Sequence, residues 1–184
     1  MNDWFYIWDT RTRFGWAAMA GTAFGARRLD FGFKTRGACL KKARLFTLET
    51  PAHKLHAQNT IAHPGPQKGP AWLFASVVAV TRRLAGENVS LSGIPMDWDG
   101  FTDFQKRVWC AALTIPYAQT RTYGWIAEHA GQPGAARAAG SALGANPLPL
   151  IVPCHRIIKS NGALGGFGMG ADIKKLLLDN ENAL

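Results

Sequence analysis

The pattern of apolar residues changes at Phe101, and this change restricts the chain to two differently built parts. Over residues 1–50, aromatic residues alternate with small and polar ones, which is typical of short strands and turns. From Phe101 onward, apolar residues recur at helical spacing. With 184 residues the chain has room for two small domains. We therefore predict an α+β protein, with an N-terminal domain over residues 1–95 and a mostly helical C-terminal domain over residues 96–184.

The rest of the first part predicts a loop, a helix and a strand. Residues 51–70 hold four prolines and two glycines, which favours a loop. Residues 71–85 predict a helix that is closed by Gly86 and has arginines near its C-terminal end. Residues 88–100 predict a strand followed by a connector.

The second part begins and ends with a predicted helix. Residues 101–116 place apolar groups at helical spacing, with Thr102 or Asp103 as the N-cap. The short apolar run at 150–152 is typical of a buried strand, and residues 171–181 predict a final helix.

Two short helices between these elements predict a helix-turn-helix. The first spans residues 122–131, and the second spans 134–144 with Pro133 near its first turn. The second helix consists mostly of alanine and glycine, and its one long polar side chain is Arg137. It could simply pack against another helix, or it could enter the minor groove of DNA and insert Arg137 into the base stack.

The charge of the chain is positive and unevenly distributed. Residues 1–90 hold 13 Lys and Arg against 5 Asp and Glu, whereas residues 91–184 hold 8 against 7. A sequence pI near 9.9 indicates a polyanion partner. The charge alone fits a solvated basic face equally well.

Hydropathy and cysteine content exclude several classes of protein. No apolar run approaches the roughly 20 residues of a membrane helix, and the N-terminus has no basic segment of a secretory signal. The odd number of widely spaced cysteines, Cys39, Cys110 and Cys154, excludes a disulfide scaffold and indicates a reducing compartment. Cys110, inside a predicted helix, is expected to be a small buried residue.

The most informative segment contains Cys154 and His155 directly after Pro153. On a turn, both side chains could face one pocket, although an adjacent Cys and His are more often structural. A thiol attacks as a thiolate, which a nearby histidine with a carboxylate partner can generate. Glu181 is a candidate for that carboxylate, and the glycine-rich run at 164–170 would let the backbone approach a ligand.

Several motifs occur in one order between residues 101 and 181: F-Q-x-x-V-W, I-P, T-Y-G-x-I-A, A-x-R-A-x-G, N-P, P-C-H-R-I-I, L-x-G-F and K-K-L-L-L-x-x-E. With these motifs, the chain resembles the O6-alkylguanine-DNA alkyltransferase family. The resemblance implies a ribonuclease-H-like N-terminal domain and a C-terminal domain that binds DNA through the helix-turn-helix.

The resemblance also implies roles for individual residues. Cys154 matches the alkyl acceptor, His155 the base that deprotonates it through a water, and Glu181 the carboxylate that orients His155. Asn146 matches the hinge between the DNA-binding element and the active-site turn. Arg137 matches the residue that fills the space left by a flipped nucleotide.

Further positions match DNA contacts and the substrate pocket. DNA contacts are implied at Tyr123, Gly124 and Ser160, and Tyr123 also matches the tyrosine that contacts the flipped guanine. A pocket wall is implied at Pro149 and Phe167, and a backbone N–H that donates to guanine O6 is implied at Gly168.

The sequence departs from the family pattern at two places in or near the pocket. Phe167 stands where a tyrosine is frequent, so one hydroxyl group is absent from the wall. Tyr117-Ala118 stands where glycine is common. Both departures concern the shape of the pocket and not the reaction.

The function implied is direct DNA repair, with single-turnover transfer of the alkyl group from O6-alkylguanine, and also O4-alkylthymine, to Cys154 after base flipping. The partner is double-stranded DNA, no cofactor is needed, and the chain is expected to be a cytoplasmic monomer, nuclear in a eukaryote. Two alternatives are a non-catalytic sensor of alkylguanine and a thiol hydrolase. Some family members carry zinc in the N-terminal domain, but Cys39 and the histidines at 53, 56 and 63 lack a convincing ligand spacing, so no metal is predicted.

Overall fold

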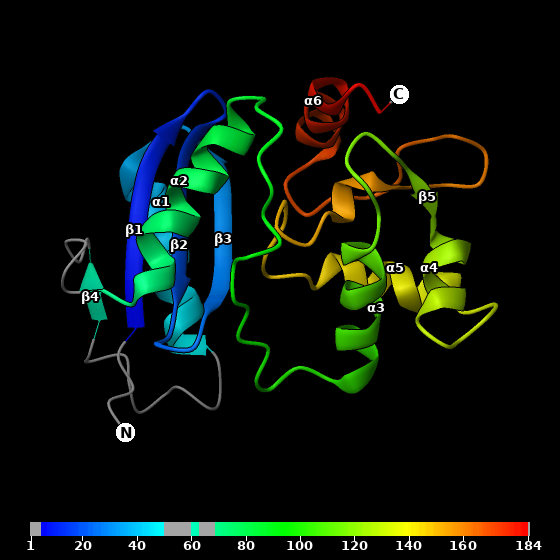
Figure 1. The fold of residues 1–184 in the computed structure, drawn as a ribbon, viewed down its shortest axis with the longest axis horizontal. Coiled ribbons are helices and arrows are strands. Elements are labelled where there is room, and N and C mark those ends of the chain that lie inside the picture. The colour runs from blue at the N-terminus through cyan, green and yellow to red at the C-terminus, as the bar shows by residue number, and fades with distance from the viewer. Residues whose placement is uncertain (1–4, 50–59, 63–68, 184) are drawn as a thin grey trace. The chain divides into compact units, whose positions relative to one another are not determined.

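The computed structural model describes residues 5–49, 60–62 and 69–183, and it divides the chain into two compact units. The first is Met1–Gly100 and the second is Phe101–Leu184. Figure 1 labels their helices and strands. Both helices and strands are present, in agreement with the predicted α+β class.

The first unit is built on a four-stranded sheet in the order β3-β2-β1-β4. Neighbouring strands are antiparallel except β1 and β4, which are parallel. A tight turn joins β1 to β2, and Gly15 adopts a φ of +110° there, where a Cβ atom would lie 2.4 Å from the carbonyl oxygen of Phe33. The strands are β1 (Phe5–Thr12), β2 (Gly15–Gly21), β3 (Ala26–Phe33) and β4 (Thr60–Ala62).

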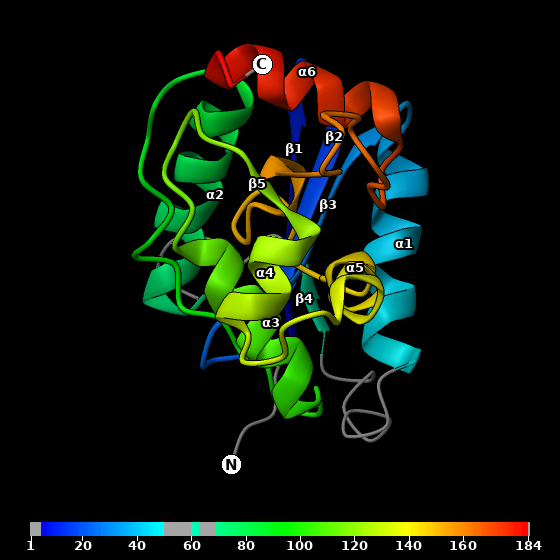
Figure 2. The ribbon, with the colours of Figure 1, turned by 90° about the vertical axis from the view of Figure 1, so that its right-hand side faces the viewer.

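Two helices cover opposite faces of this sheet, as Figure 2 shows. Helix α2 (Ala71–Leu84) agrees with the predicted helix and buries one side against the sheet. Helix α1 (Arg36–Glu49) corrects the expectation of strands and turns throughout residues 1–50. The Thr35 side chain starts α1 by accepting a hydrogen bond from the backbone N–H of Ala38. Cys39 and Ala43 then pack against Ile7 of β1.

The strand expected within residues 88–100 is not formed, and this prediction was wrong. One isolated bridge joins Met96 to Ala26, because Gly93 and Pro95 interrupt regular pairing. Side chains hold the segment instead. The buried guanidinium of Arg27 donates to the Asp97 carboxylate and to the Asp99 carbonyl oxygen, each at 2.7 Å.

The second unit starts with helix α3 (Asp103–Leu113). Thr102 is its N-cap, and a reciprocal capping box with Gln105 satisfies free N–H groups of the first turn. Trp109 is fully buried, and its indole N–H donates to the carbonyl oxygen of Ala142 at 2.9 Å. This contact ties α3 to the helix that carries Ala142.

Helices α4 (Tyr123–His129) and α5 (Ala136–Gly144) form the predicted helix-turn-helix arrangement and contact each other and α3. Thr122 caps α4 by accepting a hydrogen bond from Trp125 N–H. Helix α5 begins two residues later than expected, so Pro133 lies in the connecting turn and not in the first helical turn.

The buried strand predicted at residues 150–152 was also wrong. Leu150 has a φ of +75°, and the N–H of Val152 bonds to the carbonyl oxygen of Leu148 at 2.9 Å, so the chain turns here. A 3₁₀ turn (Cys154–Arg156) follows and leads to β6 (Ile157–Ile158), which pairs in parallel with β5 (Arg121–Thr122). Helix α6 (Ala171–Glu181) ends the described chain, as predicted.

Across the described residues, no helix combines the length and the apolar character needed to cross a membrane.

Candidate active site

Cys154 lies at the start of the 3₁₀ turn, with its side chain almost completely buried. The side-chain amide of Asn146 donates to the Cys154 sulfur and to the Val152 carbonyl oxygen, each at 3.2 Å. The Asn146 carbonyl oxygen accepts the N–H of Leu148 at 2.9 Å. Asn146 therefore holds both ends of the turn that presents the thiol.

The thiol is neutral at pH 7 when no base acts on it. Burial raises the pKa of Cys154 to about 11, and this effect outweighs the Asn146 hydrogen bond and the positive charge of Lys174, which both act in the opposite direction. Attack by Cys154 at neutral pH therefore requires removal of the thiol proton by another group.

His155 and Arg156, which directly follow Cys154 in sequence, form a buried cluster with Glu181. One ring nitrogen of His155, Nε2, lies 3.1 Å from Glu181 Oε1. Arg156 binds both oxygens of the same carboxylate, at 2.7 and 2.8 Å. The predicted meeting of His155 with Glu181, 26 residues apart in the chain, is thus present in the structure, and α6 provides the carboxylate.

The charge states of this cluster suit proton transfer. Burial lowers the pKa of His155 despite the neighbouring Glu181, so the ring is neutral and able to accept a proton. Burial opposes ionisation of Glu181, but hydrogen bonds from His155 and Arg156 outweigh it and lower its pKa to about 2. Nδ1 of His155 is buried and has no hydrogen-bond partner among the residues the structure describes, so it is the nitrogen available to a proton.

The Glu181 cluster should make the stability of the fold sensitive to acid. Because its folded pKa of about 2 lies below the unfolded value near 4.3, Glu181 contributes stability above that value, and this contribution is lost as the pH falls from about 4.3 to 2. We expect a loss of about 3 kcal/mol in the free energy of unfolding. Urea unfolding between pH 5 and pH 2 measures it. A Glu181→Gln variant with the same acid dependence would contradict the assignment.

A cavity of about 780 Å³ opens beside Cys154. Glycines make up much of its wall, which leaves room for a planar base, and none of the described residues that line it is acidic. The lining residues are Tyr123, Ala136, Arg137, Gly140, Ser141, Leu143, Gly144, Cys154, Lys159, Gly165, Gly166, Phe167 and Gly168.

Tyr123 closes one side of this cavity from the start of α4. Its hydroxyl donates to the carbonyl oxygen of Gly166 at 3.4 Å. Gly165 has a φ of +71°, and a Cβ atom there would lie 2.7 Å from the Tyr123 hydroxyl. Glycine at 165 therefore permits the tyrosine to pack against the glycine-rich loop. In the same loop, the Phe167 ring meets the His155 ring edge-on, with 6.5 Å between centroids.

Of the other residues singled out in the sequence, Arg137 lines the cavity. Gly124 and Ser160 are exposed, and Arg137 is exposed on α5. Pro149 is buried in the turn and is not among the lining residues, so its assignment to the pocket wall stays a prediction.

Sequence reasoning missed Lys174 and misjudged Cys110. The Lys174 side chain is fully buried and donates to the carbonyl oxygens of Ile157 and Gly166. Burial lowers its pKa to about 8, against the influence of Cys154. The pattern of a helix does not show whether a lysine in it is buried, so the burial of Lys174 could not be predicted.

Cys110 is exposed on α3, not buried, because its side of the helix faces away from the core.

Among the described residues, no group of three or more His, Cys, Asp or Glu side chains could hold a metal ion. The histidines at 53, 56 and 63 lie outside those residues, so the structure does not bear on them.

Comparisons with known proteins agree on one class, the DNA repair methyltransferases. Residues 103–183 match the family model described as "6-O-methylguanine DNA methyltransferase, DNA binding domain". The methylated-DNA–protein-cysteine methyltransferase of Mycobacterium tuberculosis is 47% identical over 114 residues, which are 62% of this chain and 68% of that protein. The corresponding protein of Mycobacterium leprae is 54% identical over 109 residues, which are 59% of this chain and 65% of that protein.

Solved structures extend the likeness to nearly the whole chain. The crystal structure of the M. tuberculosis O6-methylguanine methyltransferase matches with a TM-score of 0.71 and 34% identity, covering 97% of this chain and 93% of that one. Another structure of the M. tuberculosis protein, in complex with DNA, matches equally well. The chain therefore belongs to the methylated-DNA–protein-cysteine methyltransferase family.

Proposed function

We propose that this protein repairs alkylated DNA by transferring the alkyl group of O6-alkylguanine irreversibly to the sulfur of Cys154. One observation carries the proposal: Cys154 lines a cavity large enough for a base, next to a neutral histidine that is held by a buried carboxylate. The membership of the chain in a methyltransferase family agrees with this reaction.

The reaction consumes the protein. The Cys154 thiol gives its proton to His155, through a water, and the imidazolium is stabilised by Glu181. The thiolate attacks the alkyl carbon, a carbon–sulfur bond forms and the bond from that carbon to guanine O6 breaks. The electron pair goes to the guanine, which recovers a proton and is restored. The thioether product is stable, so each molecule reacts once and needs no cofactor.

The helix-turn-helix would bind the duplex and extrude the damaged nucleotide, because the alkyl carbon cannot be reached inside the stack. Helix α5 is slim enough to enter the minor groove, and Arg137 is exposed on it. Tyr123, Gly124 and Ser160 would contact the DNA at the rim of the cavity. The Gly168 N–H would donate to guanine O6.

Further details extend this proposal. O4-alkylthymine also carries its alkyl group on an exocyclic oxygen, so the same attack applies to it. The acceptor, the base and the carboxylate all lie in one unit of one chain, which favours a monomer. The protein would act where the DNA is held, which is the cytoplasm in a bacterium. The order β3-β2-β1-β4, with a parallel fourth strand reached through a helix, supports a ribonuclease-H-like first unit.

Mass spectrometry after incubation with DNA containing O6-methylguanine tests the reaction. A gain of one methyl group on the peptide that contains Cys154 is expected. An unchanged mass with retained binding would indicate a sensor of alkylguanine. Repeated turnover of a thioester without methylation would indicate a thiol hydrolase.

Replacing Arg137 should separate base flipping from chemistry. Flipping costs a few kcal/mol in lost stacking and pairing, which an inserted side chain offsets in part. We expect Arg137→Ala to slow repair of duplex DNA at least tenfold, with a much smaller effect on the reaction with free O6-benzylguanine. Single-turnover rates on both substrates measure the difference.

Arg137→Lys is the matched variant, and it should recover part of the duplex rate because it restores charge and length without the planar group. An equal loss on both substrates would mean that Arg137 supports the pocket or the fold, and insertion would be excluded.

A further inference from the structure

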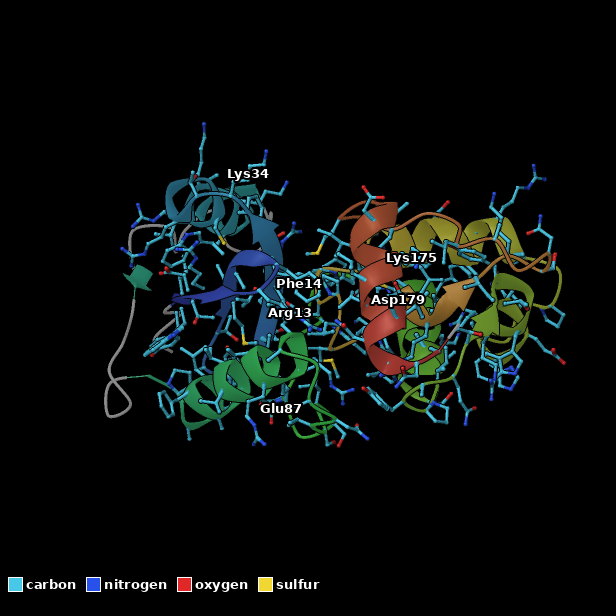
Figure 3. All side chains as sticks on the ribbon, turned by 90° about the horizontal axis from the view of Figure 1, so that it is seen from above. Arg13, Phe14, Lys34, Glu87, Lys175 and Asp179 are labelled. Carbon is cyan, nitrogen blue, oxygen red and sulfur yellow. The ribbon has the colours of Figure 1, made fainter. Side chains whose placement is uncertain are left out.

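Several basic residues of the first unit lie on or just before α1. Residues 31–48 contain five Lys and Arg and no Asp or Glu. Lys34 lies just before α1, as labelled in Figure 3, and Lys41, Lys42 and Arg44 lie on the helix. All four are exposed. We refer to these four residues as the α1 basic face.

The geometry of α1 directs these charges outward. Cys39 and Ala43 are buried against the sheet and define the inner side of the helix. At 100° per residue, Lys41 lies on the side of the helix opposite Cys39 and Ala43. Lys42 and Arg44 lie on either side of Lys41. The face therefore presents a broad cationic surface and not a single charge.

Two buried carboxylates of this unit are paired with arginines that are not part of the α1 basic face. Asp9 is paired with Arg36 at 2.6 Å, and Asp30 is paired with Arg28 at 2.7 Å. None of the three lysines forms an ion pair with any residue in the described part of the chain. Their charges remain available to a ligand.

The second unit is less basic than the first, because it has 8 Lys and Arg against 5 Asp and Glu, whereas the first has 13 against 7. Of its eight Lys and Arg residues, Arg156 and Lys174 are buried, and Lys175 is paired with Asp179 (Figure 3). Arg107 donates to a backbone carbonyl oxygen and Arg121 to Gln119. The cations at 106, 137 and 159 are at least partly exposed and remain available to DNA. Phosphate contacts supply most of the sequence-independent affinity for DNA, so cations on the first unit would add to the affinity of the second.

We propose that the α1 basic face is a second DNA-binding surface, which contacts backbone phosphates in addition to those bound by the helix-turn-helix. The inference rests on the proposed function in one respect, that DNA is the partner. Once the second unit is bound, DNA is present at high effective concentration for any cationic surface on the same chain. DNA is therefore favoured over a separate anionic partner.

The test compares two variants of the full chain with equal charge loss. The first carries Lys34→Gln, Lys41→Gln and Lys42→Gln. The control carries Arg11→Gln, Arg13→Gln and Arg82→Gln, which remove three exposed arginines elsewhere in the same unit. Fluorescence anisotropy with an undamaged 30-base-pair duplex gives the affinity across a range of salt concentrations.

We expect the lysine variant to lower the slope of log K against log salt by about 2 to 3, because each lost phosphate contact contributes about 0.9. The control should change the slope by less than half as much. The rate with free O6-benzylguanine should be unchanged in both, which shows that the fold and the pocket are intact.

Equal slope changes in the two variants would mean that only the net charge of the protein matters, and would overturn the proposal. An unchanged slope in the lysine variant would also overturn it. Loss of binding to phosphatidylserine vesicles with an unchanged DNA slope would assign the face to a membrane instead. Failure of the wild type to react with O6-benzylguanine would count against the proposed function and not against this surface.

Discussion

Replacing Cys154 by serine is expected to abolish alkyl transfer and to leave DNA binding intact. A serine hydroxyl is far less acidic than a thiol, so His155 cannot convert it to a useful nucleophile at neutral pH. The side chains are similar in size, and the Asn146 amide can donate to the oxygen as it does to the sulfur. We expect no methyl transfer above background over hours, a loss of at least about 10⁴-fold.

The measurement is the methylated fraction of protein by mass spectrometry, with duplex affinity determined in parallel. Cys110→Ser is the matched control, because this exposed cysteine lies on α3. It should react like the wild type. Stoichiometric demethylation by Cys154→Ser would show that another residue accepts the alkyl group.

Removing the imidazole of His155 should slow transfer by about 10²–10⁴-fold at pH 7, the usual value of general-base assistance. The Cys154 thiol, with its pKa raised to about 11, would then have to ionise unaided. The rate of His155→Ala should therefore rise about tenfold per pH unit as the pH increases toward 11. The ion pair between Arg156 and Glu181 remains in this variant, so the buried charges stay compensated.

Single-turnover rates with free O6-benzylguanine between pH 6 and pH 10 test this expectation without contributions from DNA binding. His129→Ala removes an exposed histidine from α4 and serves as the control. A wild-type rate for His155→Ala at pH 7 would remove the histidine from the mechanism. A slow rate that does not recover at high pH would indicate a structural role.

Much of the second unit could be predicted from local sequence. The capping box at Thr102 and the apolar spacing of residues 101–116 require only contacts within a few residues, so α3 starts where predicted. The last helix was predicted with its observed bounds for the same reason. In the first unit, α1 was missed because its apolar residues are only weakly segregated to one side of the helix, and contacts with the sheet hold it in place.

The candidate site could likewise be predicted only in part from local sequence. The sequence by itself determined that Cys154 and His155 follow a proline next to a glycine-rich segment, and motif resemblance indicated Glu181 as their partner. Only the tertiary structure decided that Glu181 neutralises Arg156 as well as holding His155, and that Lys174 is buried beside the pocket. Charge pairing and burial depend on residues distant in the chain, which no local pattern contains. The positive φ of Leu150 also depends on tertiary packing. The local apolar run favours an extended conformation, but the packed turn around the cysteine requires a positive φ at this residue.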